Sequence, residues 1–266
     1  MYSAKISPER IFIFHLTIIA GFAFAYWAVA MGGVKLPILD RPYFQRQFDL
    51  NVEGNLPSYF SGLGLLACSL VSAQLWRATG PAPERRFWMI AAAALFVMSF
   101  DEACALHEGL TFFGDRMPLH GGIFYLSWWM PYLVLLAGPC LAALPGFLRI
   151  DAVTRITLCV AGAVFVTGAL GFELLESKID YDIDVLGVGH VAALHALMKW
   201  YILVEETFEM LGVAIALRAL LGLARRVAPM VTIGLAETRA PAAYWTAEPR
   251  EARGALAAER DGDLAL

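Results

Sequence analysis

The chain has 266 residues, of which 59% are hydrophobic and 17% charged, and its formal net charge is −4. Soluble domains carry about 25% charged residues. Here the apolar residues form long runs, several of which reach the roughly 20 residues that a helix needs to cross a bilayer. The negative charge excludes a basic face for binding nucleic acid phosphates. The sequence therefore predicts an all-α, polytopic integral membrane protein surrounded by lipids.

Six apolar segments are long enough to span a membrane, and each must be helical because backbone groups in hydrocarbon have no water to bond. In chain order they cover about 11–31, 56–76, 87–113, 122–148, 154–177 and 191–224. Together they predict a transmembrane helical domain over residues 1–226. Residues 227–266 are rich in Ala with mixed charge and no sustained apolar period, which is typical of a flexible tail.

The distribution of Lys and Arg predicts the orientation. With the N-terminus inside, the cytoplasmic segments hold ten of these residues and the outer loops five, leaving aside the tail and Lys199. This excess predicts both termini in the cytoplasm and a multi-pass protein of a bacterial inner (plasma) membrane. A competing interpretation is a signal peptide cleaved after Ala30, which would leave five spans. The first apolar segment is longer than the usual 7–15 residues of a signal peptide, which favours an uncleaved anchor.

Three of the predicted spans carry ionisable residues that membrane helices avoid: Asp101, Glu102, His107 and Glu108; Glu173 and Glu176; and His195, Lys199, Glu205, Glu206 and Glu209. At 100° per residue each set forms a polar stripe on its helix, with Asp101 and Glu108 within about 20° of one another. By the same geometry Glu102 points away from the main face.

Counting about 1.5 Å per residue along the spans places these stripes at one level. Asp101, Glu173 and Glu205 all fall within about 10 Å of the outer surface of a hydrocarbon core about 30 Å thick. One Asp at the centre of a membrane helix costs about 2.5–3.5 kcal/mol, so several such groups rival the stability of a whole protein. Lys199 can neutralise only one of them. Bound cations, protons, or water in a cavity open to the outer side must offset the remaining charge.

A metal centre is the first interpretation of these residues. Carboxylates and imidazoles on facing helices are the ligand set of di-iron and di-manganese proteins. The Glu-x-x-His pattern of those proteins is absent, so the resemblance is to a chemistry and not to a family. The candidate ligands are Asp101, His107, Glu108, Glu173, His195, Glu206 and Glu209. The oxygen-rich set favours iron or manganese over zinc.

A catalytic metal would activate oxygen, for oxidation of a lipid-soluble substrate, or water, for hydrolysis. Whether the protein is an enzyme stays open. A second interpretation is a proton or cation transporter or relay that uses the same acids, although the cytoplasmic half lacks a comparable polar trail and no inverted repeat is visible. A third interpretation is a structural or accessory membrane subunit held together by interhelical polar contacts.

Overall fold

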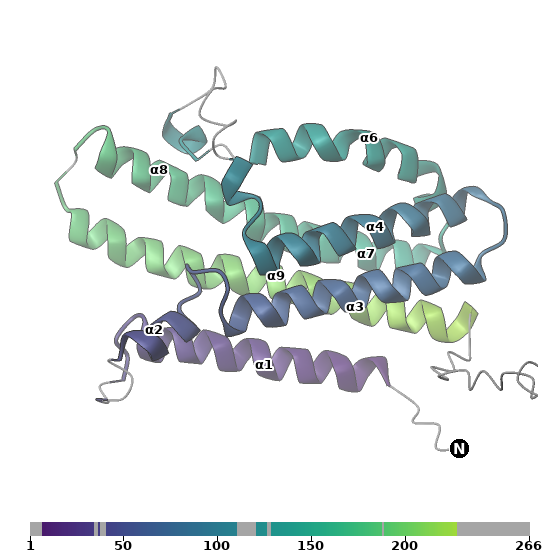
Figure 1. Ribbon diagram of the computed structural model, residues 1–266, viewed down its shortest axis with the longest axis horizontal. Helices are drawn as coiled ribbons and strands as arrows, with labels where there is room; N and C mark the ends of the chain where they lie inside the picture. Colours follow the sequence, from purple (N-terminus) through teal and green to yellow (C-terminus); the bar gives the residue numbers. More distant parts are fainter. Residues whose placement is uncertain are drawn as a thin grey trace, which may run out of the picture. The chain divides into compact units, whose positions relative to one another are not determined.

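The computed structural model describes residues 7–34, 37, 41–110, 121–126, 129–187 and 189–227, with the side chain of Glu108 excepted (Figure 1). These residues form helices, turns and connections, and no β-strand occurs among them. The predicted tail beyond residue 227 lies outside the described residues.

Within the described part of the chain, six helical segments are long and apolar enough to cross a membrane. They are α1 (Pro8–Val29), α3 (Leu56–Ala78), α4 (Pro83–Cys104), α6 (Trp129–Phe147), the composite segment Ala152–Asp184, and α9 (Val191–Val227). The predicted all-α, multi-helix membrane architecture is thereby confirmed. Its orientation, and the fate of the first span, stay predictions.

The composite segment has three parts that follow one another without a break. They are α7 (Ala152–Val166), the π-helical turn η3 (Thr167–Phe172) and α8 (Glu173–Asp184). A π turn holds one more residue than an α-helical turn and is often found at functional sites. The short elements among the described residues of the connections are α2 (Pro42–Phe48), η1 (Glu108–Leu110) and η2 (Gly122–Phe124).

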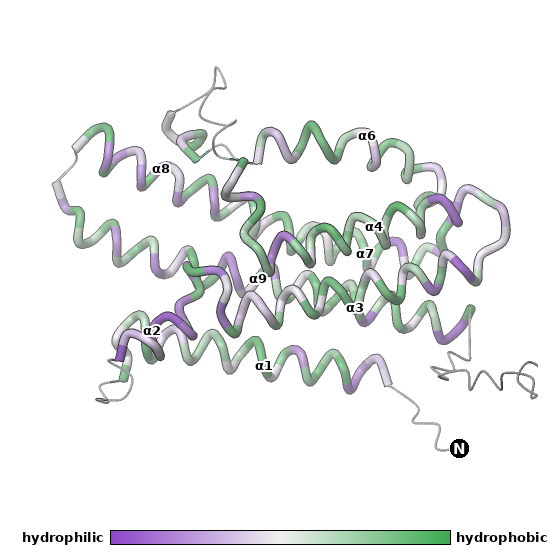
Figure 2. Tube along the Cα trace, in the orientation of Figure 1, coloured by the Kyte–Doolittle hydropathy of each residue, from purple (hydrophilic) through white to green (hydrophobic). Residues whose placement is uncertain are grey.

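Helix α9 lies along three of the other long segments, since α1, α3 and α7 all pack against it. Helix α4 packs on α3, and α6 packs on α4. A core of apolar side chains fills the contact between α3 and α9, including Leu65, Cys68 and Val213. Figure 2 shows that hydrophobic residues cover most of α1 and α6. Few residues of α4, α6 and α7 are buried within the bundle, so their apolar surfaces are available to lipid.

The composite segment approaches α9 closely because two glycines lie in the contact. A Cβ atom added at Gly168 would lie 2.6 Å from the carbonyl oxygen of Glu205. A Cβ at Gly212 would lie 2.7 Å from the Cβ of Phe165 and 2.8 Å from the carbonyl oxygen of Ala161. Small residues at such positions let helix backbones come together in membranes. The acids that follow Gly168 are therefore held directly beside those of α9.

Helix α4 ends at Cys104, before the predicted end at residue 113. Ala105 has a φ of 53° in the left-handed region, which stops the helix. The chain then turns back, and the backbone N–H of His107 donates to Oδ1 of Asp101 at 2.7 Å. The predicted helical stripe that joined Asp101 to Glu108 is therefore wrong, although the turn still brings His107 to Asp101.

Two side chains cap helices at opposite ends of the bundle. Asn55 accepts from the backbone N–H of Ser58 at the start of α3, and its Nδ2 donates to the carbonyl oxygens of Asp49 and Val52 at 2.6 Å each. The connection that carries Glu53 is thereby fixed to α3. Asp151 caps α7 by accepting from the N–H of Thr154 at 3.1 Å. Slight burial raises the pKa of Asp151, but the bonds from Thr154 and the guanidinium of Arg226 outweigh it, so this pKa lies below its ordinary value.

Candidate functional site

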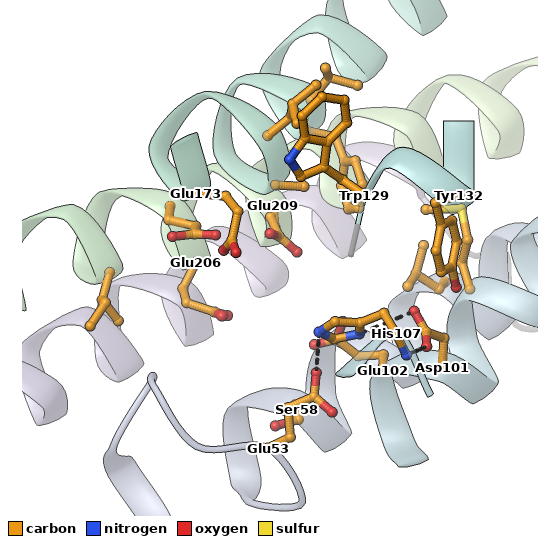
Figure 3. Close-up of a pocket in the computed structure, with 18 of the residues that line it drawn as sticks. Glu53, Ser58, Asp101, Glu102, His107, Trp129, Tyr132, Glu173, Glu206 and Glu209 are labelled. Carbon is orange, nitrogen blue, oxygen red and sulfur yellow. Dashed lines mark hydrogen bonds and ion pairs between the residues drawn. The ribbon is translucent and has the colours of Figure 1, made fainter. Parts of the chain in front are cut away.

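A cavity of about 310 Å³ lies inside the bundle, bordered by α3, α4, α6, α7, η3, α8, α9, the connection before α3 and the turn after α4. Its wall has an acidic part and an apolar part. The ionisable side chains that line it are Glu53, Asp101, Glu102, His107, Glu173, Glu176, Glu205, Glu206 and Glu209. Among the described residues, no Lys or Arg lines this cavity. Figure 3 shows the acids in two groups that face one another across it.

The first group surrounds His107. Its Nδ1 lies 3.3 Å from Oδ2 of Asp101, and its Nε2 lies 3.4 Å from Oε1 of Glu53 (Figure 3). Burial lowers the pKa of His107, but the hydrogen bond with Asp101 and the charge of Glu53 raise it by more, so the pKa lies above its ordinary value. This favours an imidazolium that donates to a carboxylate at each nitrogen.

The first group also ties three helices together. Asp101 on α4 lies beside Tyr132 on α6, and Glu102 on α4 lies beside Ser61 on α3. Because Glu53 precedes α3 in the chain, its contact with His107 joins that connection to the end of α4. This part of the site is therefore built from three elements that are far apart in sequence.

The second group comes from α8 and α9. Glu173, Glu206 and Glu209 point into the cavity close to one another (Figure 3). Behind them Glu176 and Glu205 are 7% and 9% exposed, with their carboxyl groups beside one another. A hydrogen bond between two carboxyl groups requires a proton on one of them, because an ionised carboxylate only accepts. A proton or a bound cation is therefore needed to offset the repulsion between these two acids.

The cavity brings together five of the seven predicted ligands: Asp101, His107, Glu173, Glu206 and Glu209. Glu108 begins η1, and its side chain lies outside the described part of the chain.

His195 does not line this cavity. Its side chain is exposed and borders a separate cavity between α1 and α9. The ten residues between His195 and Glu205 correspond to about 15 Å along the helix, so a shared face does not bring them together. Lys199 also lies there and donates to the carbonyl oxygen of Ala30 at 2.9 Å, so it does not neutralise the acids.

Glu102 is a correction to the sequence analysis, because it lines the cavity and was expected to point away. The face that excluded Glu102 was defined by Asp101 and Glu108 on one helix, and α4 ends before Glu108. Gly62 on α3 lets α4 come close at this level, because a Cβ at position 62 would lie 3.3 Å from the carbonyl oxygen of Ser99. The bond from the Ser99 hydroxyl to the Gly62 carbonyl at 2.7 Å holds the two helices at this separation.

Sequence reasoning missed Glu53 and Tyr132 as parts of the site, and it placed Glu176 in the polar stripe without naming it as a ligand. A signal existed for Glu53, which lies three residues before the predicted second span, at the same end of the bundle as the other acids. The role of Tyr132 has no such signal, because aromatic residues are expected near the end of any membrane span.

The side chains of the cavity are not arranged as a finished metal site. Among the described residues, no group of three or more His, Cys, Asp or Glu side chains lies at metal-holding separation. Both ring nitrogens of His107 face carboxylates, so coordination by this residue requires Asp101 or Glu53 to release one of them. An ion would have to draw the carboxylates of the second group inward.

The fold and the cavity define a multi-pass helical membrane protein with an acid-lined interior. The chain belongs to the family described as a domain of unknown function (DUF8692), whose model matches residues 11–224. The matched region contains every ionisable residue of the cavity. No curated protein and no solved structure matches this chain.

Proposed function

We propose that the acid-lined cavity binds a divalent metal ion, and that the protein is a metal-dependent membrane enzyme acting on a lipid-soluble substrate. The observation that supports this is that eight carboxylates and one histidine line a single cavity that the described residues supply with no Lys or Arg. Burying that many carboxylates without compensation is very unfavourable. The His107 imidazolium offsets only part of the charge.

The proposed ligands are Glu173, Glu206 and Glu209, which point into the cavity from two facing helices (Figure 3). Carboxylates on facing helices of a bundle are characteristic of iron and manganese centres, and an oxygen-rich set favours these metals over zinc. Carboxylates change rotamer readily, so modest side-chain motion can complete the coordination. The metal would supply activation of oxygen or of water, which makes an oxidoreductase or a hydrolase the candidate activity.

The test is the metal content of the full chain purified in detergent. The protein is incubated with Mn²⁺, Fe²⁺ or Zn²⁺, desalted, and analysed for bound metal. We expect stoichiometric Mn²⁺ or Fe²⁺ in the wild type and loss of it in Glu206→Gln/Glu209→Gln. Asp184→Asn is the matched control, because Asp184 is an exposed acid at the other end of α8. A folded wild type with no more metal than the double variant would exclude the metal site.

A proton relay is the second candidate, and the adjacent buried carboxyl groups of Glu176 and Glu205 favour it. Carboxylates that exchange protons inside a membrane are typical of such relays. Proteoliposomes with a trapped pH dye and an imposed potential distinguish the two functions. A relay predicts proton flux that Glu176→Gln/Glu205→Gln abolishes, whereas the metal enzyme predicts none above empty vesicles.

A further inference from the structure

The cavity reaches the outside of the bundle between α6 and α7. Leu133 on α6 and Val166 on α7 both line it, yet they are 52% and 53% exposed. Helix α6 packs on α4, whereas α7, the next long helix in the chain, packs on α9. Figure 1 shows α6 set apart from α7 along most of its length. We call the gap between these two side chains the lateral opening.

The surface around the lateral opening is apolar. Val134 and Leu135 on α6 are 76% and 67% exposed, and Val160 on α7 is 49% exposed. Both helices belong to segments long and apolar enough to cross a membrane. Inside the opening the wall continues with the apolar side chains of Leu136, Phe165, Ala169 and Leu170. A molecule that passes here comes from the hydrocarbon of the bilayer and not from water.

The inner end of this apolar path has an unused hydrogen-bond donor. Trp129 lines the cavity, and its indole Nε1 is buried with no hydrogen-bond partner among the described residues. A buried donor without a partner is unfavourable and is relieved by an acceptor atom on a ligand. The neighbouring carboxylates repel a negatively charged group, and a bound metal ion repels a positively charged one. An uncharged oxygen is the group that suits both.

We propose that a single-chain lipid with an uncharged, oxygen-bearing end, a long-chain alcohol or aldehyde, enters the cavity sideways through the lateral opening. The oxygen accepts from Trp129, and the chain leaves between Leu133 and Val166. This deepens the proposed function and rests on it in two respects: the lipid end is placed beside the metal, and the metal excludes a positively charged end. Ligand cavities span roughly 300–1,000 Å³, so one of about 310 Å³ admits an end group and the start of one chain.

Photo-crosslinking of the full chain in lipid nanodiscs tests the proposal. The probe is a dodecanol that carries a diazirine near its hydroxyl. We expect labelling within residues 129–136 and 165–170, with unlabelled dodecanol competing about tenfold better than dodecanoate, a difference of one strong interaction. Trp129→Phe should weaken the competition by dodecanol. Equal competition by dodecanoate, or stronger competition by dodecylamine, would overturn the uncharged end group.

A pair of variants tests the route. Leu133→Trp narrows the lateral opening and should lower labelling about tenfold. Leu135→Trp adds the same bulk to the lipid-exposed face of α6, outside the cavity lining, and should label as the wild type does. Equal labelling of the two variants would overturn lateral entry.

Metal content, measured on the same samples, separates this inference from the proposed function. Labelling that follows the predicted pattern in a metal-free wild type supports the lateral opening and removes the metal site. Bound metal with labelling that Leu133→Trp does not change supports the metal site and removes the lateral opening.

Discussion

Replacing Gly168 by Ala should destabilise the protein even though Ala is the better helix former. An Ala Cβ at position 168 would lie 2.6 Å from the carbonyl oxygen of Glu205 and 3.1 Å from the backbone nitrogen of Glu209. Both are backbone atoms of α9, so no rotamer change relieves the contact. The segment that carries Glu173 must therefore move away from α9.

The expected magnitude follows from two opposing effects. Overpacking costs about 1–3 kcal/mol, and a contact with backbone belongs at the upper end of that range. The gain in helix propensity is about 1 kcal/mol. The net loss is then about 2 kcal/mol, which lowers the melting temperature by about 4–8 °C for a domain of this size.

Gly162→Ala is the matched control on the same helical segment, since nothing lies within 4 Å of its added Cβ. It should be neutral or stabilising by up to about 1 kcal/mol. Thermal unfolding in detergent, followed by tryptophan fluorescence, measures both variants. The two substitutions are thus expected to change the stability in opposite directions. If Gly168→Ala melts at or above the temperature of Gly162→Ala, the close approach of η3 to α9 is wrong.

Three further predictions concern single side chains. Glu209→Gln removes a buried charge, so the metal-free variant should melt at a higher temperature than the metal-free wild type. The stabilisation that Mn²⁺ gives the wild type, about 2.7 kcal/mol at a hundredfold excess over Kd, should vanish in the variant. An unchanged rise in melting temperature on adding Mn²⁺ would contradict the ligand assignment. Asp151→Ala should cost about 1 kcal/mol of cap stability. Because the folded-state pKa of Asp151 is lowered, its stabilisation is present above the unfolded-state pKa and is lost as pH falls through the folded-state value. The melting temperatures of the wild type and Asp151→Ala should therefore converge as the pH is lowered. A difference in melting temperature that stays constant with pH would refute this. Ser177→Ala removes the hydroxyl that accepts from the backbone N–H of Leu126, 2.8 Å away in the wild type, at a cost of about 1–3 kcal/mol. Hydrogen exchange over residues 121–126 should therefore be faster in the variant. Exchange at the wild-type rate would exclude a role of Ser177 in holding this segment.

Hydrophobic patterning was sufficient to predict the helices, because a bilayer leaves little choice for long apolar segments. It could not predict where α4 ends. Residues 105–113 continue the apolar composition of the span, and the left-handed conformation of Ala105 has no signature in an alanine. His107 consequently reaches Asp101 through a turn and not along a helical face.

Helix phase predicted the residues that line the cavity less well than hydrophobic patterning predicted the helices. It grouped His195 with the acids of α9, although the rise along the helix separates them. It rejected Glu102, because the phase was measured against Glu108 on a helix that ends at Cys104. The position of Glu53 depends on the hydrogen bonds of Asn55, which are tertiary information. The identities of most acids were thus predictable, and their partners were not.

The π turn at Thr167–Phe172 gives the acids of α8 their direction. Because a π turn holds one more residue than an α-helical turn, an unbroken α-helix through the same residues would rotate Glu173 and Glu176 by about 100° from their present direction. The acidic pair would then leave the cavity while the apolar face of α7 stayed in place. A deletion of one residue in this turn would instead restore a plain α-helix with the pair still facing the cavity, so the extra residue is what α-helical hydrogen bonding there would have to lose.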